Sequence, residues 1–92
     1  KENYVIKLST EYENTLWQIV SIYHIKNTND YLKISFNTND EFINYSEMIL
    51  NRSLYNFKTP ISINDKLLTI STYYNKDEKL VLHAKLIKYE IK

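Results

Sequence analysis

The sequence predicts an α+β domain built mostly of antiparallel strands, with one helix between them. Three observations lead to this prediction: runs of β-branched and aromatic residues between asparagine-rich turns, one segment with helical spacing, and a closing pair of runs joined by a short polar turn. Strands grouped around a single helix are typical of α+β folds. With 92 residues, the chain forms one domain or part of one.

Two strands open the predicted order. Residues 3–10, NYVIKLST, alternate weakly, and residues 15–26, TLWQIVSIYHIK, form a longer run. Strict alternation would place Trp17, Ile19, Tyr23 and Ile25 on one face of the second strand. Because its other face is also largely apolar, we expect this strand to lie at the centre of the sheet.

One helix is predicted to follow a short extended piece. Thr38 and Glu41 form a capping box, in which each side chain accepts a hydrogen bond from a backbone N–H at the helix start. Phe42, Tyr45 and Ile49 then recur at spacings of three and four, which indicates an amphipathic helix of about three turns. A loop, KTPISIND, comes next, since its proline interrupts regular structure.

The closing hairpin is predicted from two more strands, about Lys66–Tyr73 and Lys79–Ile91, with the polar turn between them. Small hydroxyl residues gather toward the end of the first of these strands: Thr69, Ser71 and Thr72. A strand end of this kind often carries a reactive group in an enzyme. Here two tyrosines, Tyr73 and Tyr74, follow the hydroxyl residues, and no obvious nucleophile stands at this strand end.

Composition excludes several kinds of site. Cysteine is absent, which excludes disulfides, thiolate metal sites and cysteine catalysis by this chain. Glycine is absent as well, which argues against glycine-rich phosphate loops. A net charge of +1 with interspersed charges gives no electrostatic reason to expect nucleic acid. The two histidines and scattered carboxylates show no metal-ligand spacing, so neither a metal nor a cofactor is expected.

His24 and His83 are the only groups whose unperturbed pKa lies near neutrality. Each lies inside a predicted strand, where a packed or surface role is more common than catalysis. The sequence shows no apolar run long enough for a membrane-spanning helix and no signal peptide. The first residue is Lys1 rather than Met, so we expect a processed product or an excised piece.

The closing segment LLTISTYYNKDEKLVLHAKLIK resembles the end of class B sortases. In that family a strand ends in a Thr-Leu-Ser-Thr-Cys-like run, and a short loop leads to an Arg and a strand like Val-Val-His-Ala-Lys-Leu. Upstream, DYLKISF and RSLYNF fit the same family in the same order, so the resemblance covers roughly Val5 to Lys88. It implies the later half of an eight-stranded barrel with one helix between strands.

The resemblance also implies a function. Class B sortases are cysteine transpeptidases of Gram-positive cell surfaces, placed at the outer face of the membrane or in the cell wall. They cut a sorting signal and join its new carboxyl end to an amine on peptidoglycan or a pilin, using a Cys, a His and an Arg. A thiolate attacks the peptide carbonyl, and the Arg steadies the developing charge or the substrate.

This chain departs from the family at both matched catalytic positions. Tyr73 stands at the Cys position and Lys79 at the Arg position. A phenol with a pKa near 10 is protonated at neutrality, and lysine lacks the forked geometry of arginine. The family's catalytic His lies before the matched segment, so neither His24 nor His83 inherits that role. We therefore expect this chain alone to be inactive.

Four positions match the family's substrate groove, and they are Tyr31, Leu32, Ser71 and Thr72. Alternatively, Tyr31 and Leu32 simply pack under the helix. Three interpretations follow: an inactive sortase-like domain, a module that binds an extended sorting-signal-type peptide without cutting it, or a structural half-barrel. The last would be completed by a second chain or by self-association, because open strand edges invite partners.

Overall fold

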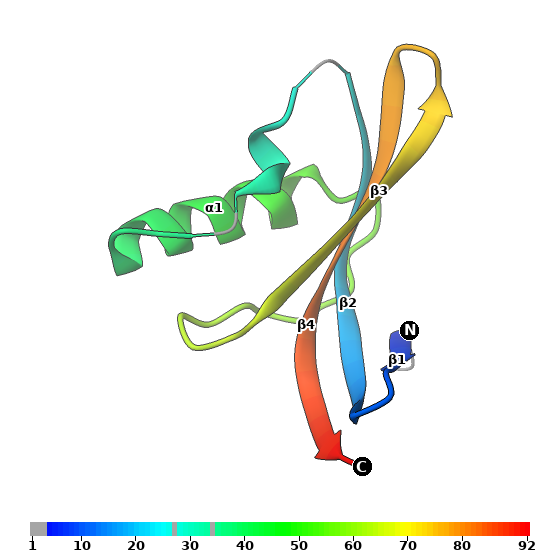
Figure 1. The fold of residues 1–92 in the computed structure, drawn as a ribbon. Coiled ribbons are helices and arrows are strands. Elements are labelled where there is room, and N and C mark those ends of the chain that lie inside the picture. Colours follow the sequence, from blue (N-terminus) through cyan, green and yellow to red (C-terminus); the bar gives the residue numbers. More distant parts are fainter. Residues whose placement is uncertain (1–3, 27, 34) are drawn as a thin grey trace.

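The computed structural model describes residues 4–26, 28–33 and 35–92. Its elements are β1 (Val5–Ser9), β2 (Glu13–Lys26), the short 3-10 helix η1 (Asp30–Leu32), α1 (Asn39–Arg52), β3 (Leu67–Asn75) and β4 (Glu78–Ile91). The strands form one antiparallel sheet in the order β1-β2-β4-β3. The sheet is strongly twisted, and α1 and η1 lie on one side of it (Figure 1). The predicted α+β architecture is therefore confirmed. The start of the first predicted strand, before residue 4, lies outside the described residues.

Strand β2 has a neighbour on each side, as predicted, but its alternation contains a break. Ile19 pairs with Ala84, whereas Ser21 pairs with His83. Because adjacent residues of β4 point to opposite faces, Ile19 and Ser21 also lie on opposite faces. Val20 is the extra residue of a β-bulge. The predicted common face for Trp17, Ile19, Tyr23 and Ile25 is therefore wrong, because the bulge moves Tyr23 and Ile25 to the other face.

Helix α1 begins where the capping pair predicts. Thr38 Oγ1 accepts a hydrogen bond from the Glu41 N–H at 3.1 Å. The return bond differs from the expected capping box, because Glu41 Oε1 accepts from the Asn37 N–H at 3.0 Å instead of from the Thr38 N–H. The helix continues to Arg52 and is about one turn longer than predicted. Its buried face includes Phe42, Tyr45 and Ile49, as the spacing predicts.

The core lies between α1, η1 and one face of the sheet, which is called the helix face below. Its buried members are Tyr23, Tyr31, Tyr45, Ile49 and Val81. Three of these five residues are tyrosines, and a buried phenol usually needs a hydrogen-bond partner. Polar contacts therefore accompany the packing in this core, and several of them surround the candidate site.

Asparagine shapes the turn between β3 and β4. The Asn75 side-chain oxygen accepts hydrogen bonds from the backbone N–H groups of Asp77 and Glu78, both at 2.9 Å. An asparagine that bonds its own backbone two and three residues ahead stabilises a tight turn without glycine. This turn sets the register of the hairpin, in which Tyr73 lies directly across from Lys79.

Candidate functional site

Tyr73 and Lys79, which the resemblance matches to the family's Cys and Arg positions, meet at the end of the β3–β4 hairpin. Tyr73 and Lys79 face one another across the ladder, and the Lys79 ammonium lies 5.7 Å from the centre of the Tyr73 ring. The same ammonium lies 6.0 Å from the centre of the Tyr31 ring. Both distances fit cation–π contacts. Lysine at this position is thus flanked by two aromatic rings, while the Tyr73 side chain is 77% exposed.

Tyr31 and Leu32 belong to η1 and differ sharply in exposure. Tyr31 is completely buried, and its hydroxyl has no hydrogen-bond partner among the described residues. Leu32 is 49% exposed. Leu32 is therefore accessible from solvent, whereas the Tyr31 ring lies beneath the Lys79 ammonium. Burial of Tyr31 agrees with the interpretation that this residue packs beneath the helix.

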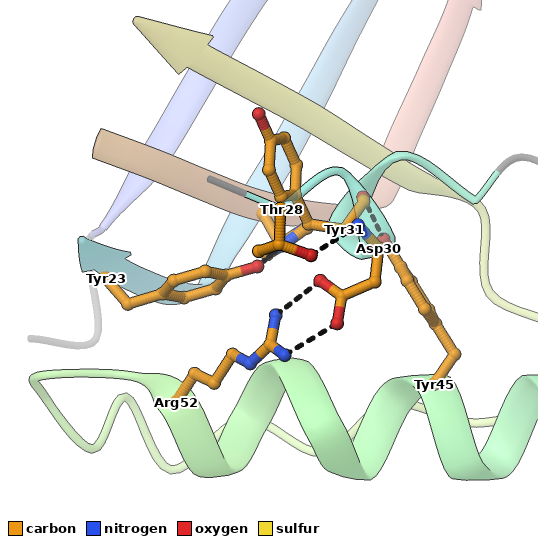
Figure 2. Close-up of polar contacts among 7 residues, drawn as sticks. Tyr23, Thr28, Asp30, Tyr31, Tyr45 and Arg52 are labelled. Carbon is orange, nitrogen blue, oxygen red and sulfur yellow. Dashed lines mark hydrogen bonds and ion pairs between the residues drawn. The ribbon is translucent and has the colours of Figure 1, made fainter. Parts of the chain in front are cut away.

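Helix α1 holds η1 in place through two contacts (Figure 2). Arg52 donates to both carboxylate oxygens of Asp30, each at 2.8 Å, and the Tyr45 hydroxyl donates to the Tyr31 carbonyl oxygen. The hydrogen bonds from Arg52 hold the pKa of Asp30 below its usual value, and those to Asp30 raise the pKa of Arg52. The forked geometry pairs the two charges in one orientation. We call this pair the Asp30–Arg52 clamp.

Ser71 and Thr72 lie on opposite faces of the sheet, because adjacent strand residues alternate. Ser71 pairs with Val81 and shares the helix face with Tyr73. Thr72 pairs with Leu80 on the outer face, away from η1. Both residues are exposed. The structure thus brings Ser71, Tyr73 and Lys79 to one face near η1, and it places Thr72 apart from them.

His83 is buried in a polar network beneath the helix. Its Nε2 lies 2.8 Å from the Tyr23 hydroxyl, and its Nδ1 lies 2.9 Å from Thr69 Oγ1. Burial, with a smaller contribution from the positive charge of Arg52, lowers the pKa of His83 to about 4. The ring is therefore neutral at pH 7, so one hydroxyl donates to it and the other accepts from it. Burial also raises the pKa of Tyr23 to about 12.

His24 lies on the outer face, since it pairs with Leu80. Its ring stacks on Tyr74 at 4.0 Å, and its Nδ1 lies 3.9 Å from a Glu78 carboxylate oxygen. Neither histidine is placed to exchange a proton with residue 73. His83 has both ring nitrogens occupied in the core, and His24 lies on the opposite face of the sheet.

Several hollows lie along the described surface. Leu32 borders one of about 590 Å³, between η1, α1 and residues 63–69. A pocket of about 420 Å³ adjoins Tyr73 and Lys79 and is walled by Ile25, Thr28 and the hairpin turn. A larger hollow of about 1040 Å³ lies between Tyr4, β2 and residues 54–59, and it contains none of the predicted site residues. No group of three or more potential metal ligands occurs among the residues that the structure describes. In the same part of the chain, no helix is long and apolar enough to cross a membrane.

Sequence reasoning missed the Asp30–Arg52 clamp and the role of the His83 network. One signal was present for the clamp, because Arg52 is the only arginine in the chain and arginine is the residue best suited to a two-pronged carboxylate contact. Local sequence gave no comparable signal for the network. Its members, Tyr23, Thr69 and His83, come from three strands, and their contact depends on the bulge at Val20.

Comparison with solved structures identifies the fold. The chain superposes on the crystal structure of Staphylococcus aureus sortase B with a TM-score of 0.82 and 21% identity, over 92% of this chain and 42% of that one. With Clostridium perfringens sortase B, the TM-score is 0.81 and the identity is 21%, over 92% of this chain and 49% of that one. With sortase B from B. anthracis in complex with AAEK1, the TM-score is 0.71 and the identity is 28%, over 82% of this chain and 34% of that one. No protein-family model and no curated protein matches the sequence.

These similarities define the class of architecture: the chain has the sortase B fold, with an antiparallel sheet and one helix. It spans less than half the length of each of these sortase B chains.

Proposed function

We propose that the chain is a sortase B-like domain that does not carry out transpeptidation. The observation behind the proposal is the pairing of an exposed Tyr73 with Lys79 at the hairpin end of a sortase B fold, in a chain without cysteine. Thioester chemistry requires a thiolate, and a neutral phenol is a poor nucleophile for acyl transfer at pH 7. The resemblance supports the cell surface of a Gram-positive bacterium as its location.

A cleavage assay tests this proposal. The 92-residue chain is incubated with a sorting-signal peptide of the Asn-Pro-x-Thr-x type, and the products are followed by mass spectrometry, with S. aureus sortase B as the positive control. We expect intact peptide and no covalent adduct. Cleavage by the pure chain would overturn the proposal.

The double variant Tyr73→Cys, Lys79→Arg extends the assay. It restores the thiol and the guanidinium, yet we expect no thioester with the peptide. The reason is structural, because His24 lies on the outer face, both ring nitrogens of His83 are hydrogen-bonded in the core, and no other histidine is present in the sequence. A thioester detected by mass spectrometry would show that a histidine is not needed.

A second candidate function is binding of an extended peptide without cleavage. It is favoured by three exposed side chains, Leu32, Ser71 and Tyr73. Tyr73 borders the pocket beside Lys79, Ser71 lies on the same face of the sheet as Tyr73, and Leu32 borders a separate hollow on the helix side. An apolar side chain, a hydroxyl and a cation together suit a peptide with mixed polarity.

An NMR titration with the same peptide tests the binding function. We expect localised ¹H–¹⁵N shifts at Leu32, Ser71 and Tyr73, and weaker binding by the Leu32→Ala variant. The matched control is Ile43→Ala, which removes a similarly exposed apolar side chain from the solvent side of α1. A dispersed spectrum that does not change with added peptide would eliminate this second function.

A further inference from the structure

Six polar side chains form a continuous series of contacts between the helix and the sheet, and both ends of the series lie at η1. The series runs from Asp30 through Arg52, Tyr23, His83, Thr69 and Tyr45 to the Tyr31 carbonyl oxygen. Its three rings, Tyr23, Tyr45 and His83, are buried by this chain itself. We call these six residues the extended His83 network.

The direction of the hydrogen bonds is fixed at the Arg52 end, because arginine only donates. Besides Asp30, the Arg52 guanidinium faces Tyr23, with its central carbon 5.7 Å from the ring centre, and it donates to the Tyr23 hydroxyl oxygen (Figure 2). The Tyr23 hydroxyl hydrogen is then left to donate to His83 Nε2, which lies 2.8 Å away. Nε2 therefore accepts and carries no hydrogen.

The opposite end of the network leads to the same result independently. A carbonyl oxygen only accepts, so the Tyr45 hydroxyl donates to Tyr31. Burial raises the pKa of Tyr45, and a hydrogen bond that Thr69 donates to the Tyr45 oxygen opposes this rise. Thr69 Oγ1 is then left to accept from His83 Nδ1, at 2.9 Å. Both ends therefore assign the hydrogen of the neutral ring to Nδ1.

Among the described residues, none of the groups in contact with the His83 ring is an anion. Its polar and charged neighbours are Tyr23 from β2, Thr69 from β3, and Tyr45 and Arg52 from α1, with Asp30 of η1 beyond Arg52. On the same face of β4, Lys79 lies against two aromatic rings and Lys85 lies 3.5 Å from Asp65. A positive charge on His83 therefore has no direct partner and acts on the network itself.

We propose that His83 is held as the Nδ1–H tautomer at neutral pH, and that a proton taken from water at Nε2 breaks the network at Tyr23 and loosens η1 from α1. Once Nε2 carries a hydrogen it can only donate, so the Tyr23 hydroxyl loses its acceptor. The Tyr23 oxygen then lies between two cations, His83 and Arg52, which repel one another. Arg52 is the partly exposed one of the two, so it is the side chain that moves, and its hold on Asp30 weakens.

The consequence reaches the candidate site from below. Helix η1 carries the exposed Leu32 and the buried Tyr31, whose ring lies beneath Lys79. Burial lowers the pKa of His83 to about 4, so this change belongs to acid conditions. None of it depends on the proposed function, and neither the cleavage assay nor the peptide titration decides it.

Long-range ¹H–¹⁵N NMR of the imidazole ring tests the tautomer at pH 7. The sequence has only two histidines, so the variant His24→Gln leaves His83 as the single imidazole. We expect the hydrogen on Nδ1 and a free lone pair on Nε2. A ring with its hydrogen on Nε2, or an equal mixture of the two tautomers, would overturn the assignment.

An NMR pH titration tests the link to η1. We expect the Leu32 N–H, which donates to the Asn29 carbonyl oxygen, to shift with the same midpoint as the His83 ring. Its hydrogen exchange, corrected for the intrinsic effect of pH, should become about fivefold faster or more. The Leu86 N–H, which bonds across the sheet, should keep its protection. Loss of protection at Leu86 together with Leu32 would mean that the whole fold opens, and separate loosening of η1 would be wrong.

The first pair of variants tests whether His83 is the source of the change. His83→Gln should abolish the acid step at Leu32, whereas His24→Gln, on the outer face, should keep it. Circular dichroism at pH 7 checks that both variants are folded. An acid step at Leu32 that persists in His83→Gln would show that another group causes it.

The second pair tests whether the Asp30–Arg52 clamp carries the change, through its reciprocal effect on the histidine. Asp30→Asn leaves the charge of Arg52 unbalanced and should lower the pKa of His83 further. Lys33→Gln removes a nearby cation outside the network and should leave that pKa unchanged. Equal pKa values of His83 in the two variants would exclude the clamp as the connection.

Discussion

Among single residues, His83 has an acid–base chemistry that burial alters strongly. Its ring is buried between Tyr23 and Thr69, with both nitrogens hydrogen-bonded. Charging this ring would place an uncompensated cation in the core, close to the existing charge of Arg52. A histidine in this setting stabilises the sheet by satisfying two hydroxyls, and it has no free nitrogen for proton transfer at a surface site.

The first prediction concerns the pH dependence contributed by His83. Its pKa is about 4 in the folded chain and near 6.5 when unfolded, so the unfolded state takes up a proton first. Stability is therefore complete above about pH 6.5 and falls toward pH 4, by up to about 3 kcal/mol. Urea unfolding at pH 7, 5.5 and 4.5 measures this loss.

The control for that measurement separates the two histidines. His83→Gln removes the buried imidazole and should flatten the pH dependence, although it also lowers stability at pH 7. His24→Gln, which changes a residue on the outer face, should retain the pH dependence of the natural chain. Equal slopes for the natural chain and His83→Gln would contradict the assignment.

At the level of elements, η1 depends on α1 for its position. It has only three residues, too few to hold a helical turn by itself, and the Asp30–Arg52 clamp ties it to the last turn of the helix. The Tyr45 hydroxyl adds a second contact at the Tyr31 carbonyl. Because Tyr31 lies under Lys79, the clamp also sets the floor of the candidate site.

The second prediction is that breaking the clamp loosens η1 more than it destabilises the fold. Asp30→Asn keeps the shape but removes the charge pair, which is partly exposed and contributes about 1 kcal/mol or less. Hydrogen exchange of the Leu32 N–H, which bonds to the Asn29 carbonyl in η1, should become faster.

Lys33→Gln is the matched control, since it removes the neighbouring and longer ion pair with Glu41 at 3.7 Å. It should leave exchange at Leu32 unchanged. If Asp30→Asn and Lys33→Gln had the same effect on that amide, the clamp would not be what positions η1.

At the level of the whole molecule, one core joins the helix to the sheet. Ile49 is fully buried against tyrosines from β2, η1 and α1, and the Ser21 hydroxyl donates to its carbonyl oxygen. Truncation here would leave a cavity in contact with several elements at once. The outer face of the sheet, by contrast, carries apolar residues such as Ile70 that stay partly exposed.

The third prediction compares two isoleucines of the same helix. Ile49→Ala should lower the free energy of unfolding by about 2–5 kcal/mol, because the side chain is entirely buried. Ile43→Ala should change it by only about 0.5 kcal/mol, since that side chain is 42% exposed. Urea unfolding monitored by circular dichroism measures both. Similar losses for the two variants would contradict the proposed position of the core.

The sequence by itself determined the α+β class, the central place of β2, the start and buried face of α1 and the β3–β4 hairpin. These features follow from local spacing, capping and turn chemistry, which each segment carries within itself. The resemblance to class B sortases also came from the ordered segments, and the fold agrees with it.

Only the tertiary structure decided which residues share a site. The bulge at Val20 reverses the faces of β2 beyond it, and no alternation rule predicts an extra residue. The clamp and the His83 network join residues far apart in the chain, and burial of Tyr31 depends on the packing of η1 against α1. Such contacts are decided by how the elements pack, because each partner alone carries no local signal for the other.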